Sequence, residues 1–232
     1  MFYYDWTLII LIPAFILAVV AQSKVKSAYN RYVRVPDRRG ITGEQTARMI
    51  LDSHGMSDVP IHQVSGELSD HYDPSKRTVS LSGDVYQGAS IASVAIAAHE
   101  CGHAMQHQTG YALLRIRNAI AMPVNLISMA SWPLLIIGII MIQAGSYVGG
   151  NLVFNIGVLA FGGVVLFHLV TLPVELDASK RALRELEAEG IIYEEEIYGA
   201  KKVLSAAALT YVAALATAVA QLLRILLLRG NN

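Results

Sequence analysis

Four blocks of apolar residues divide the chain, and each is long enough to cross the hydrocarbon core of a membrane. They cover residues 6–22, 123–144, 152–173 and 203–223. A spanning helix needs roughly 20 predominantly apolar residues. The fourth block is rich in alanine, so its pattern leaves open a transmembrane helix or a peripheral one. We therefore predict a mostly α membrane protein with three to four transmembrane helices.

The polar segment between the first two blocks begins with an amphipathic helix over residues 41–56. Thr42 is a candidate N-cap with Gln45 three positions later, which is the spacing of a capping box, and Gly55 is a stop signal. Apolar positions recur at the helical spacing, and they form one face that packs against the rest of the segment: Ala47, Ile50 and Leu51.

Polar and apolar side chains alternate over residues 59–64 and 78–81, which is typical of strands. A turn signal, Asp-Pro-Ser-Lys at residues 73–76, lies between them and predicts a hairpin. A long helix follows over residues 90–108 and ends at Gly110. Together with the amphipathic helix, these elements predict a small α+β module.

The composition agrees with a membrane protein. The chain is 54% hydrophobic and 16% charged, whereas soluble domains carry about 25% charged residues. The formal net charge of +0 at pH 7 argues against a nucleic-acid-binding protein, which usually has a basic surface. The single cysteine, Cys101, excludes an intramolecular disulfide and any cysteine-rich metal cluster.

Basic residues orient the predicted helices. Residues 23–48 contain seven Lys or Arg and two acidic residues, and no basic residue precedes the first block, which favours a retained anchor over a signal peptide. The positive-inside rule places residues 23–120 and 174–202 in the cytosol. Arg224 and Arg229 break this pattern, so either the C-terminus lies outside or the fourth block is re-entrant or peripheral.

The predicted organisation of this multi-pass protein has five segments. They are an N-terminal transmembrane anchor (1–22), a cytosolic α+β module (23–120), a transmembrane helix pair (121–174), a cytosolic helical segment (175–202) and a C-terminal transmembrane or peripheral helix (203–232). The lipid bilayer is therefore one partner, and no sequence feature indicates an oligomeric state.

The predicted helix over residues 90–108 contains the pattern His-Glu-x-x-His. His99 and His103 lie four positions apart on one helical face, so both imidazoles can reach a single zinc ion. Glu100 lies about 100° round the helix, where a general base can take a proton from a water molecule on the zinc. Two core histidines with hydrogen-bonding neighbours are the alternative. The uncharged residues around the motif favour a buried helix and the zinc interpretation.

A catalytic zinc needs a third protein ligand. His107 lies eight residues beyond His99, which is about 12 Å along the helix and too far to share the ion. Glu175 and Asp177 stand at the cytosolic end of the third block, on the same predicted side of the membrane as the two histidines. The third ligand is therefore expected from this pair of carboxylates.

Four stretches of this sequence resemble one family in order and over nearly the whole chain. The sequence is similar to the bacterial membrane zinc metallopeptidases of the YugP type, which are neutral zinc metallopeptidases. More distantly, it is similar to the HtpX heat-shock protease and the CAAX prenyl proteases. The stretches are GELSDHYDPSKRTVSLS, AAHECGHAMQH, PVELDASKRA and AAALTYVAA.

The resemblance implies a zincin-like catalytic module with one zinc ion and a peptide or membrane-protein substrate, in a bacterial cell membrane with the active site on the cytoplasmic side. In the distant relatives a helix carries the third ligand as Glu, with Ala three and Asp four positions later. Glu175 matches the ligand and Ala178 the alanine, whereas Ser179 replaces the Asp that would orient a ligating histidine.

The resemblance also implies a zinc endopeptidase in which Glu100 is the general base. Its substrate would add as a strand to an exposed sheet edge, for which residues 78–82 are the candidate. The candidates for stabilising the oxyanion are His71, Tyr72 and Tyr211. The alternative function is a chaperone-like or structural zinc-binding membrane protein without hydrolysis, and the intact Glu100 argues against it.

Overall fold

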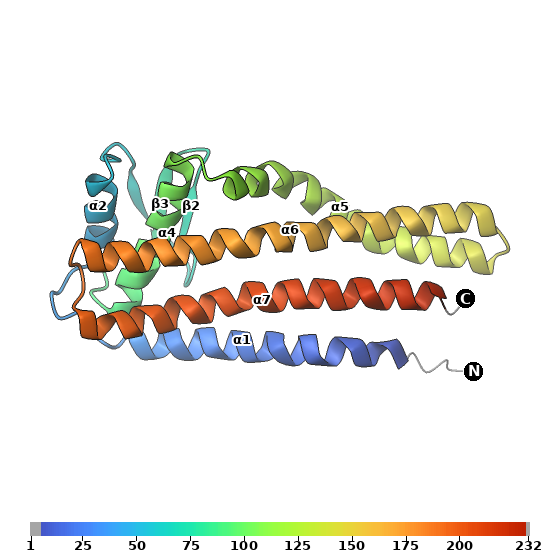
Figure 1. The fold of residues 1–232 in the computed structure, drawn as a ribbon, viewed down its shortest axis with the longest axis horizontal. Coiled ribbons are helices and arrows are strands. Elements are labelled where there is room, and N and C mark those ends of the chain that lie inside the picture. Colours follow the sequence, from blue (N-terminus) through green and yellow to red (C-terminus); the bar gives the residue numbers. More distant parts are fainter. Residues whose placement is uncertain (1–5, 231–232) are drawn as a thin grey trace. The chain divides into compact units, whose positions relative to one another are not determined.

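The computed structural model describes residues 6–230, and long helices dominate it (Figure 1). The elements in chain order are a 3-10 helix (Trp6–Ile10), α1 (Leu11–Tyr32), α2 (Gly43–Ser53), β1 (Ile61–Val64), β2 (His71–Asp73), β3 (Thr78–Ser82), α3 (Gly83–Tyr86), α4 (Ile91–Gln108), α5 (Ala112–Gln143), α6 (Tyr147–Ala188) and α7 (Glu194–Gly230).

Within residues 6–230, four helices are long and apolar enough to cross a membrane, and each covers most or all of one of the four predicted blocks. They are Thr7–Tyr32, Ala112–Gln143, Tyr147–Ala188 and Glu194–Arg229. For the fourth block the sequence leaves open a transmembrane or a peripheral helix. In the structure this block lies within the uninterrupted helix α7. The prediction of a mostly α membrane protein with a small α+β module is confirmed.

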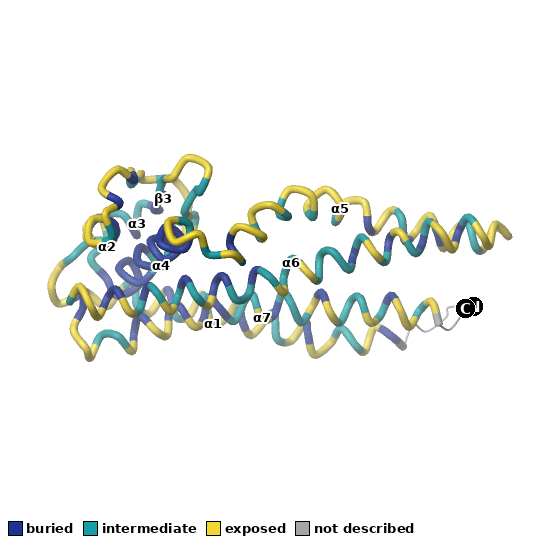
Figure 2. The backbone as a smooth tube through the Cα atoms, turned by 45° about the horizontal axis from the view of Figure 1, so that its top comes forward, coloured by how far each residue is buried: buried dark blue, intermediate teal, exposed yellow. Residues whose placement is uncertain are grey.

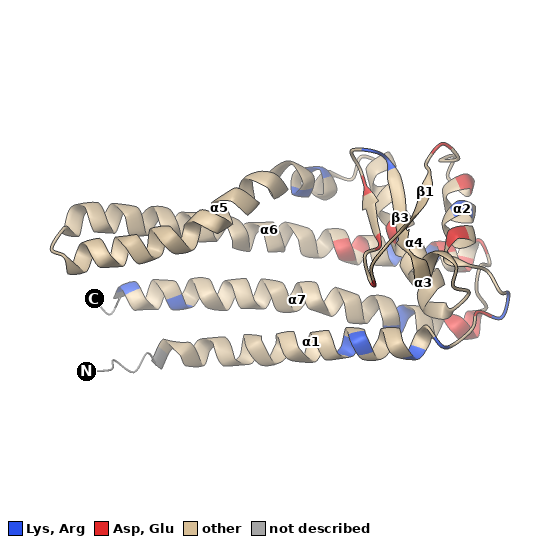
Figure 3. Ribbon diagram, turned by 180° about the vertical axis from the view of Figure 1, so that it is seen from behind, with Lys and Arg blue, Asp and Glu red and all other residues tan. Residues whose placement is uncertain are grey.

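The chain forms two compact units, which we call the apolar unit and the packed unit. Among the described residues, the apolar unit holds those up to 20, 115–172 and those from 211 onward. The packed unit holds residues 21–114 and 173–210. Charged residues lie mainly on the elements of the packed unit (Figure 3). In the apolar unit many large apolar residues are exposed. Figure 2 marks the exposed positions along these helices in yellow.

Helix α2 forms as the sequence predicts. The Thr42 side chain accepts a hydrogen bond from the Gln45 backbone N–H, and the Gln45 side chain accepts one from the Thr42 N–H, so the capping box is confirmed. The helix ends before Gly55, whose φ of 68° is in the left-handed region that glycine tolerates. The predicted apolar face is buried: Ala47, Ile50 and Leu51.

The sheet differs from the predicted hairpin. A third strand, β2, pairs antiparallel with β3, and the predicted turn lies between these two strands. Strand β1 pairs with β3 in parallel, so the strand order is β1-β3-β2. The prediction that residues 78–82 offer an exposed edge is therefore wrong, because both sides of β3 are already paired. The edges of this sheet are β1 and β2.

Helix α4 lies at the centre of the packed unit and runs close to the predicted bounds of 90–108. Ser90 caps its start by accepting a hydrogen bond from the Ser93 N–H. Fourteen of its 18 residues are buried, including Glu100 and His103. A helix that is buried nearly all round is a core element. Polar side chains on it therefore need partners from the neighbouring elements.

Candidate metal centre

Two helices of the packed unit bring together the side chains that could hold a metal ion. His99 and His103 extend from one face of α4, and Glu175 extends from α6. The Glu175 Oε2 atom lies 3.3 Å from His99 Nε2 and 3.6 Å from His103 Nε2. One ligand atom from each of the three residues lies within 4.8 Å of the other two.

This spacing fits zinc. Ligand atoms at about 2.0–2.1 Å from a tetrahedral zinc ion lie roughly 3.4 Å from one another. The two distances from Glu175 to the imidazole nitrogens bracket this value. Glu175 is nearly buried, with 3% of its side chain exposed, whereas 16% of the His99 side chain is exposed. The cluster thus has one side open to solvent, where a water molecule or a substrate can enter.

A close crossing of α4 and α6 brings Glu175 to the histidines. A Cβ atom on Gly102 would lie 2.5 Å from the carbonyl oxygen of Ala178, which is closer than atoms can approach without moving. Glycine at position 102 and alanine at position 178 therefore allow the two helices to touch. Ala178 is completely buried at this crossing. Glu175 lies almost one turn before Ala178 on α6, which places its carboxylate beside His99 and His103.

Gln106 orients His103 through a chain of hydrogen bonds. Its Nε2 atom donates to the Val174 carbonyl (2.8 Å) and to the Asp177 carboxylate (2.9 Å). Its Oε1 atom is therefore the acceptor that faces His103 Nδ1, 3.0 Å away. Nδ1 of His103 must then carry the proton, which leaves the lone pair of Nε2 for a metal ion. No motif in the sequence indicates this role for Gln106.

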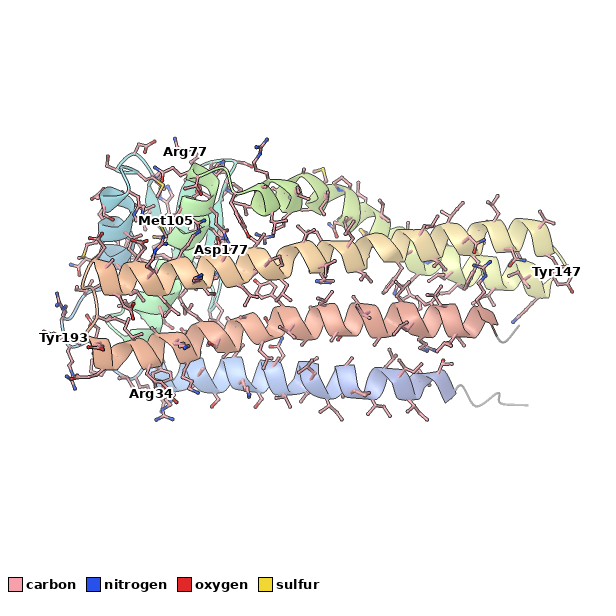
Figure 4. The ribbon with its side chains drawn as sticks, viewed as in Figure 1. Arg34, Arg77, Met105, Tyr147, Asp177 and Tyr193 are labelled. Carbon is pink, nitrogen blue, oxygen red and sulfur yellow. The ribbon has the colours of Figure 1, made fainter. Side chains whose placement is uncertain are left out.

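Ser179 stands in the same relation to His99. Its Oγ atom lies 3.2 Å from His99 Nδ1. A histidine that binds a metal through Nε2 donates from Nδ1, so the hydroxyl oxygen of Ser179 would accept this hydrogen bond. Asp177 contacts neither histidine directly. It accepts hydrogen bonds from Arg181 (2.7 Å) and Gln106. Asp177, labelled on α6 in Figure 4, therefore supports His103 indirectly, through Gln106.

The electrostatics of the cluster favour a cation. Burial alone would lower the pKa of His103, but the hydrogen bond to Glu175 and the negative charges of Glu100 and Glu175 raise it above its ordinary value. The site therefore attracts positive charge, which a divalent metal ion supplies. Glu100 is 8% exposed, and within residues 6–230 its carboxylate accepts no hydrogen bond. It is therefore available to a water molecule.

Cys101 lies inside the motif but is not among the residues of the cluster. Its side chain is completely buried, and its Sγ atom faces the Ala47 carbonyl of α2 at 3.7 Å. Burial raises the pKa of this thiol, so it stays protonated. The residue packs α4 against α2.

The three oxyanion candidates have different surroundings. Tyr72, on β2, has its hydroxyl 2.8 Å from Nδ1 of His107, one turn beyond His103 on α4. His71 is exposed, and its Nδ1 atom lies 2.8 Å from the Ser69 carbonyl. Tyr211 belongs to α7 in the apolar unit. The hydroxyl of Tyr72 is therefore fixed to the helix that carries His99 and His103.

Comparisons with known proteins agree with this chemistry. A family model described as "Putative neutral zinc metallopeptidase" matches residues 7–230. The chain is 45% identical over 221 residues to a protein of Bacillus subtilis (strain 168) named "Putative membrane protease YugP", and the match covers 95% of each chain. No solved structure matches the chain significantly.

Proposed function

The chain belongs to the family of neutral zinc metallopeptidases, and we propose that it is a membrane-embedded zinc endopeptidase. The observation that carries this proposal is the cluster of His99, His103 and Glu175, in which the Glu175 carboxylate lies 3.3 and 3.6 Å from the two imidazole nitrogens, with Glu100 next to His99 in the chain. We assign the first three residues as ligands of one zinc ion. We assign Glu100 as the general base.

In this proposal zinc, when bound, polarises the scissile carbonyl and a water molecule. Glu100 takes a proton from that water, and its carboxylate then gives the proton to the departing amine. Gln106 and Ser179 hold the Nδ1 atoms of the two ligating histidines, so that both imidazoles keep their orientation during the reaction. The hydroxyl of Tyr72 is our first candidate for stabilising the oxyanion.

The substrate class is a peptide or an extended segment of a membrane protein. Such a segment can add to the free edge of β2, the edge strand that packs on α4. Its backbone N–H and C=O groups would pair with the unpaired groups of His71–Asp73. This edge replaces residues 78–82, which lie in the middle of the sheet.

Glu100→Gln tests the proposed function, because it keeps the shape of the side chain and removes the base. We expect cleavage of membrane-peptide substrates by the purified protein to fall by several orders of magnitude, with zinc content unchanged. Chelation should abolish the activity of the unchanged protein and added zinc should restore it. A variant with near-normal, chelator-sensitive cleavage would contradict the mechanism. Stoichiometric zinc with no cleavage by the unchanged protein would favour the non-hydrolytic alternative.

The active site is proposed to face the cytosol, because seven basic residues lie within residues 23–48. Cysteine labelling in a Cys101→Ala background tests this. Ser75→Cys should resist an impermeant thiol reagent on intact cells, whereas Ser146→Cys, between α5 and α6, should react. Both serines are exposed, so access alone does not separate them. Labelling at position 75 from outside would reverse the orientation.

A further inference from the structure

A basic groove between α1 and α7 lies apart from the metal centre, within the packed unit. It has a volume of about 610 Å³ and is lined by residues of these two helices only. Ligand sites commonly have volumes of about 300–1,000 Å³. Three cations reach into it: Lys24 and Arg31 from α1, and Lys202 from α7. Neither the proposed ligands nor Glu100 line it.

The three cations have no acidic partner. The groove lining contains no Asp or Glu, and in the part of the chain that the structure describes none of the three forms an ion pair with a carboxylate. The heads of two of them lie against aromatic rings instead. Lys202 Nζ is 5.0 Å from the centre of the Tyr198 ring, and Arg31 Cζ is 5.5 Å from that of Tyr32. The positive charge is therefore free to bind an anion.

The other lining groups suit a phosphate ester that carries an apolar tail. The hydroxyls of Ser27 and Ser205 can donate hydrogen bonds to phosphate oxygens. Leu209 adds an apolar side chain two turns further along α7 from Lys202. The groove thus combines cations and hydroxyl donors with an apolar side chain.

The position of the groove along both helices matches the level of lipid headgroups. Lys24 is the second residue after the first apolar block, which ends at residue 22, and Lys202 directly precedes the fourth block, which begins at residue 203. Both lysines therefore stand where an apolar helix leaves the hydrocarbon core. Basic pockets at this level, between transmembrane helices, attract anionic lipid headgroups.

We propose that this groove binds an anionic phospholipid, with the headgroup phosphate between Lys24, Arg31 and Lys202 and the acyl chains leaving the groove past Leu209. The proposal is independent of the proposed peptidase activity. A bound lipid would join α1 to α7 at a point where cations face each other across the groove. Binding would relieve the repulsion between them.

The test compares two double variants of the full chain in detergent. Lys24→Gln with Lys202→Gln removes two cations from the groove. Lys26→Gln with Lys201→Gln removes the same charge from the same helices at exposed positions that do not line the groove. Native mass spectrometry measures the retention of added phosphatidylglycerol, with phosphatidylcholine as the uncharged-headgroup comparison.

We expect the groove variant to bind phosphatidylglycerol about 25-fold more weakly, at roughly fivefold per cation, and the control variant to bind within about twofold of the unchanged chain. Phosphatidylcholine binding should change in neither. Equal losses in both variants would mean a general charge effect, and no loss in either would mean that lipid binds elsewhere. Either result overturns the proposal.

Single variants of Arg31 and competition with glycerol 3-phosphate give two further tests of lipid binding in the groove. If the double variant does not fold, Arg31→Gln should lose about fivefold and Arg31→Lys should retain most of the binding, because the charge is kept. Millimolar glycerol 3-phosphate should not displace the lipid, since it lacks acyl chains. Displacement at micromolar concentration would assign the groove to a soluble phosphate ester and overturn the lipid proposal.

Discussion

The two units of this protein use apolar residues in opposite ways. The packed unit buries a cluster of 25 apolar residues inside itself, whereas the corresponding cluster of the apolar unit has four among the described residues. Helix α6 contributes to both units, and its leucines show the contrast. Leu186 is completely buried in the packed unit, and Leu159 in the apolar unit is 76% exposed.

This difference determines which unit can contain a site made of charged and polar side chains. Exposed leucines on a spanning helix are covered by lipid, which has no groups to satisfy a carboxylate or an imidazole. In the packed unit, by contrast, α4 is surrounded by protein, and neighbouring side chains meet the needs of its polar groups. Each histidine of the cluster has a partner on Nδ1, one on α4 itself and one on α6. The candidate metal site depends on this second kind of environment.

The largest expected effect concerns residues on either side of the boundary between the units on α6. Glu175→Ala should lower zinc affinity by more than the roughly 10–100-fold typical of residues that only support the ligands. Asp177→Ala should cost less. His168→Phe, seven residues earlier and in the apolar unit, should leave zinc affinity unchanged. Titration with a competing chelator measures all three. Zinc that survives Glu175→Ala and is lost with Asp177→Ala would mean that the wrong carboxylate was chosen.

The second prediction compares the same substitution in the two environments of α6. Leu186→Ala should destabilise the protein by about 2–5 kcal/mol, because it leaves a cavity in a closed core. Leu159→Ala should change the stability by no more than about 0.5 kcal/mol, because removing this exposed side chain leaves no cavity inside the protein. Thermal unfolding in one detergent gives both values as shifts in Tm. Similar shifts for the two variants would break the contrast between the units.

The smallest effects should come from the residues that hydrogen-bond to the two histidines of the cluster. Gln106→Leu should weaken zinc binding towards the upper end of the roughly 10–100-fold range, because it leaves the Val174 carbonyl and His103 Nδ1 without a partner in a buried place. Ser179→Ala should stay near the lower end, since part of the His99 side chain is exposed and water can replace the hydroxyl. The reverse order would show that His99 depends more on its partner than His103 does.

Local patterns were enough to predict much of this structure. The four apolar blocks, the capping box at Thr42 and the helix over residues 90–108 all depend on near neighbours in the sequence, and all are present. Spacing along a single helix likewise placed His99 and His103 on one face. Each of these features is decided within a few helical turns, where periodicity and capping act.

Contacts between distant segments were harder to predict. Strand β2 has only three residues, too few to show alternation. The sequence pattern therefore predicts a hairpin between β1 and β3, whereas the turn joins β2 to β3. Because the pattern does not predict β2, it also does not predict that β1 and β3 pair in parallel. Gln106 has a role only because α6 brings Val174 and Asp177 beside it. The sequence of α4 alone contains no sign of this.

The crossing at Gly102 also bears on how much information a short motif carries. In the pattern His-Glu-x-x-His the two middle positions are usually left unspecified. Here the second one faces the carbonyl oxygen of Ala178, and no side chain larger than hydrogen fits. Glycine makes up about 7% of residues in proteins, so requiring it would remove roughly thirteen of every fourteen chance matches, a gain of nearly four bits. A glycine in the motif of α4 thus indicates that a second helix, here α6, packs closely against it.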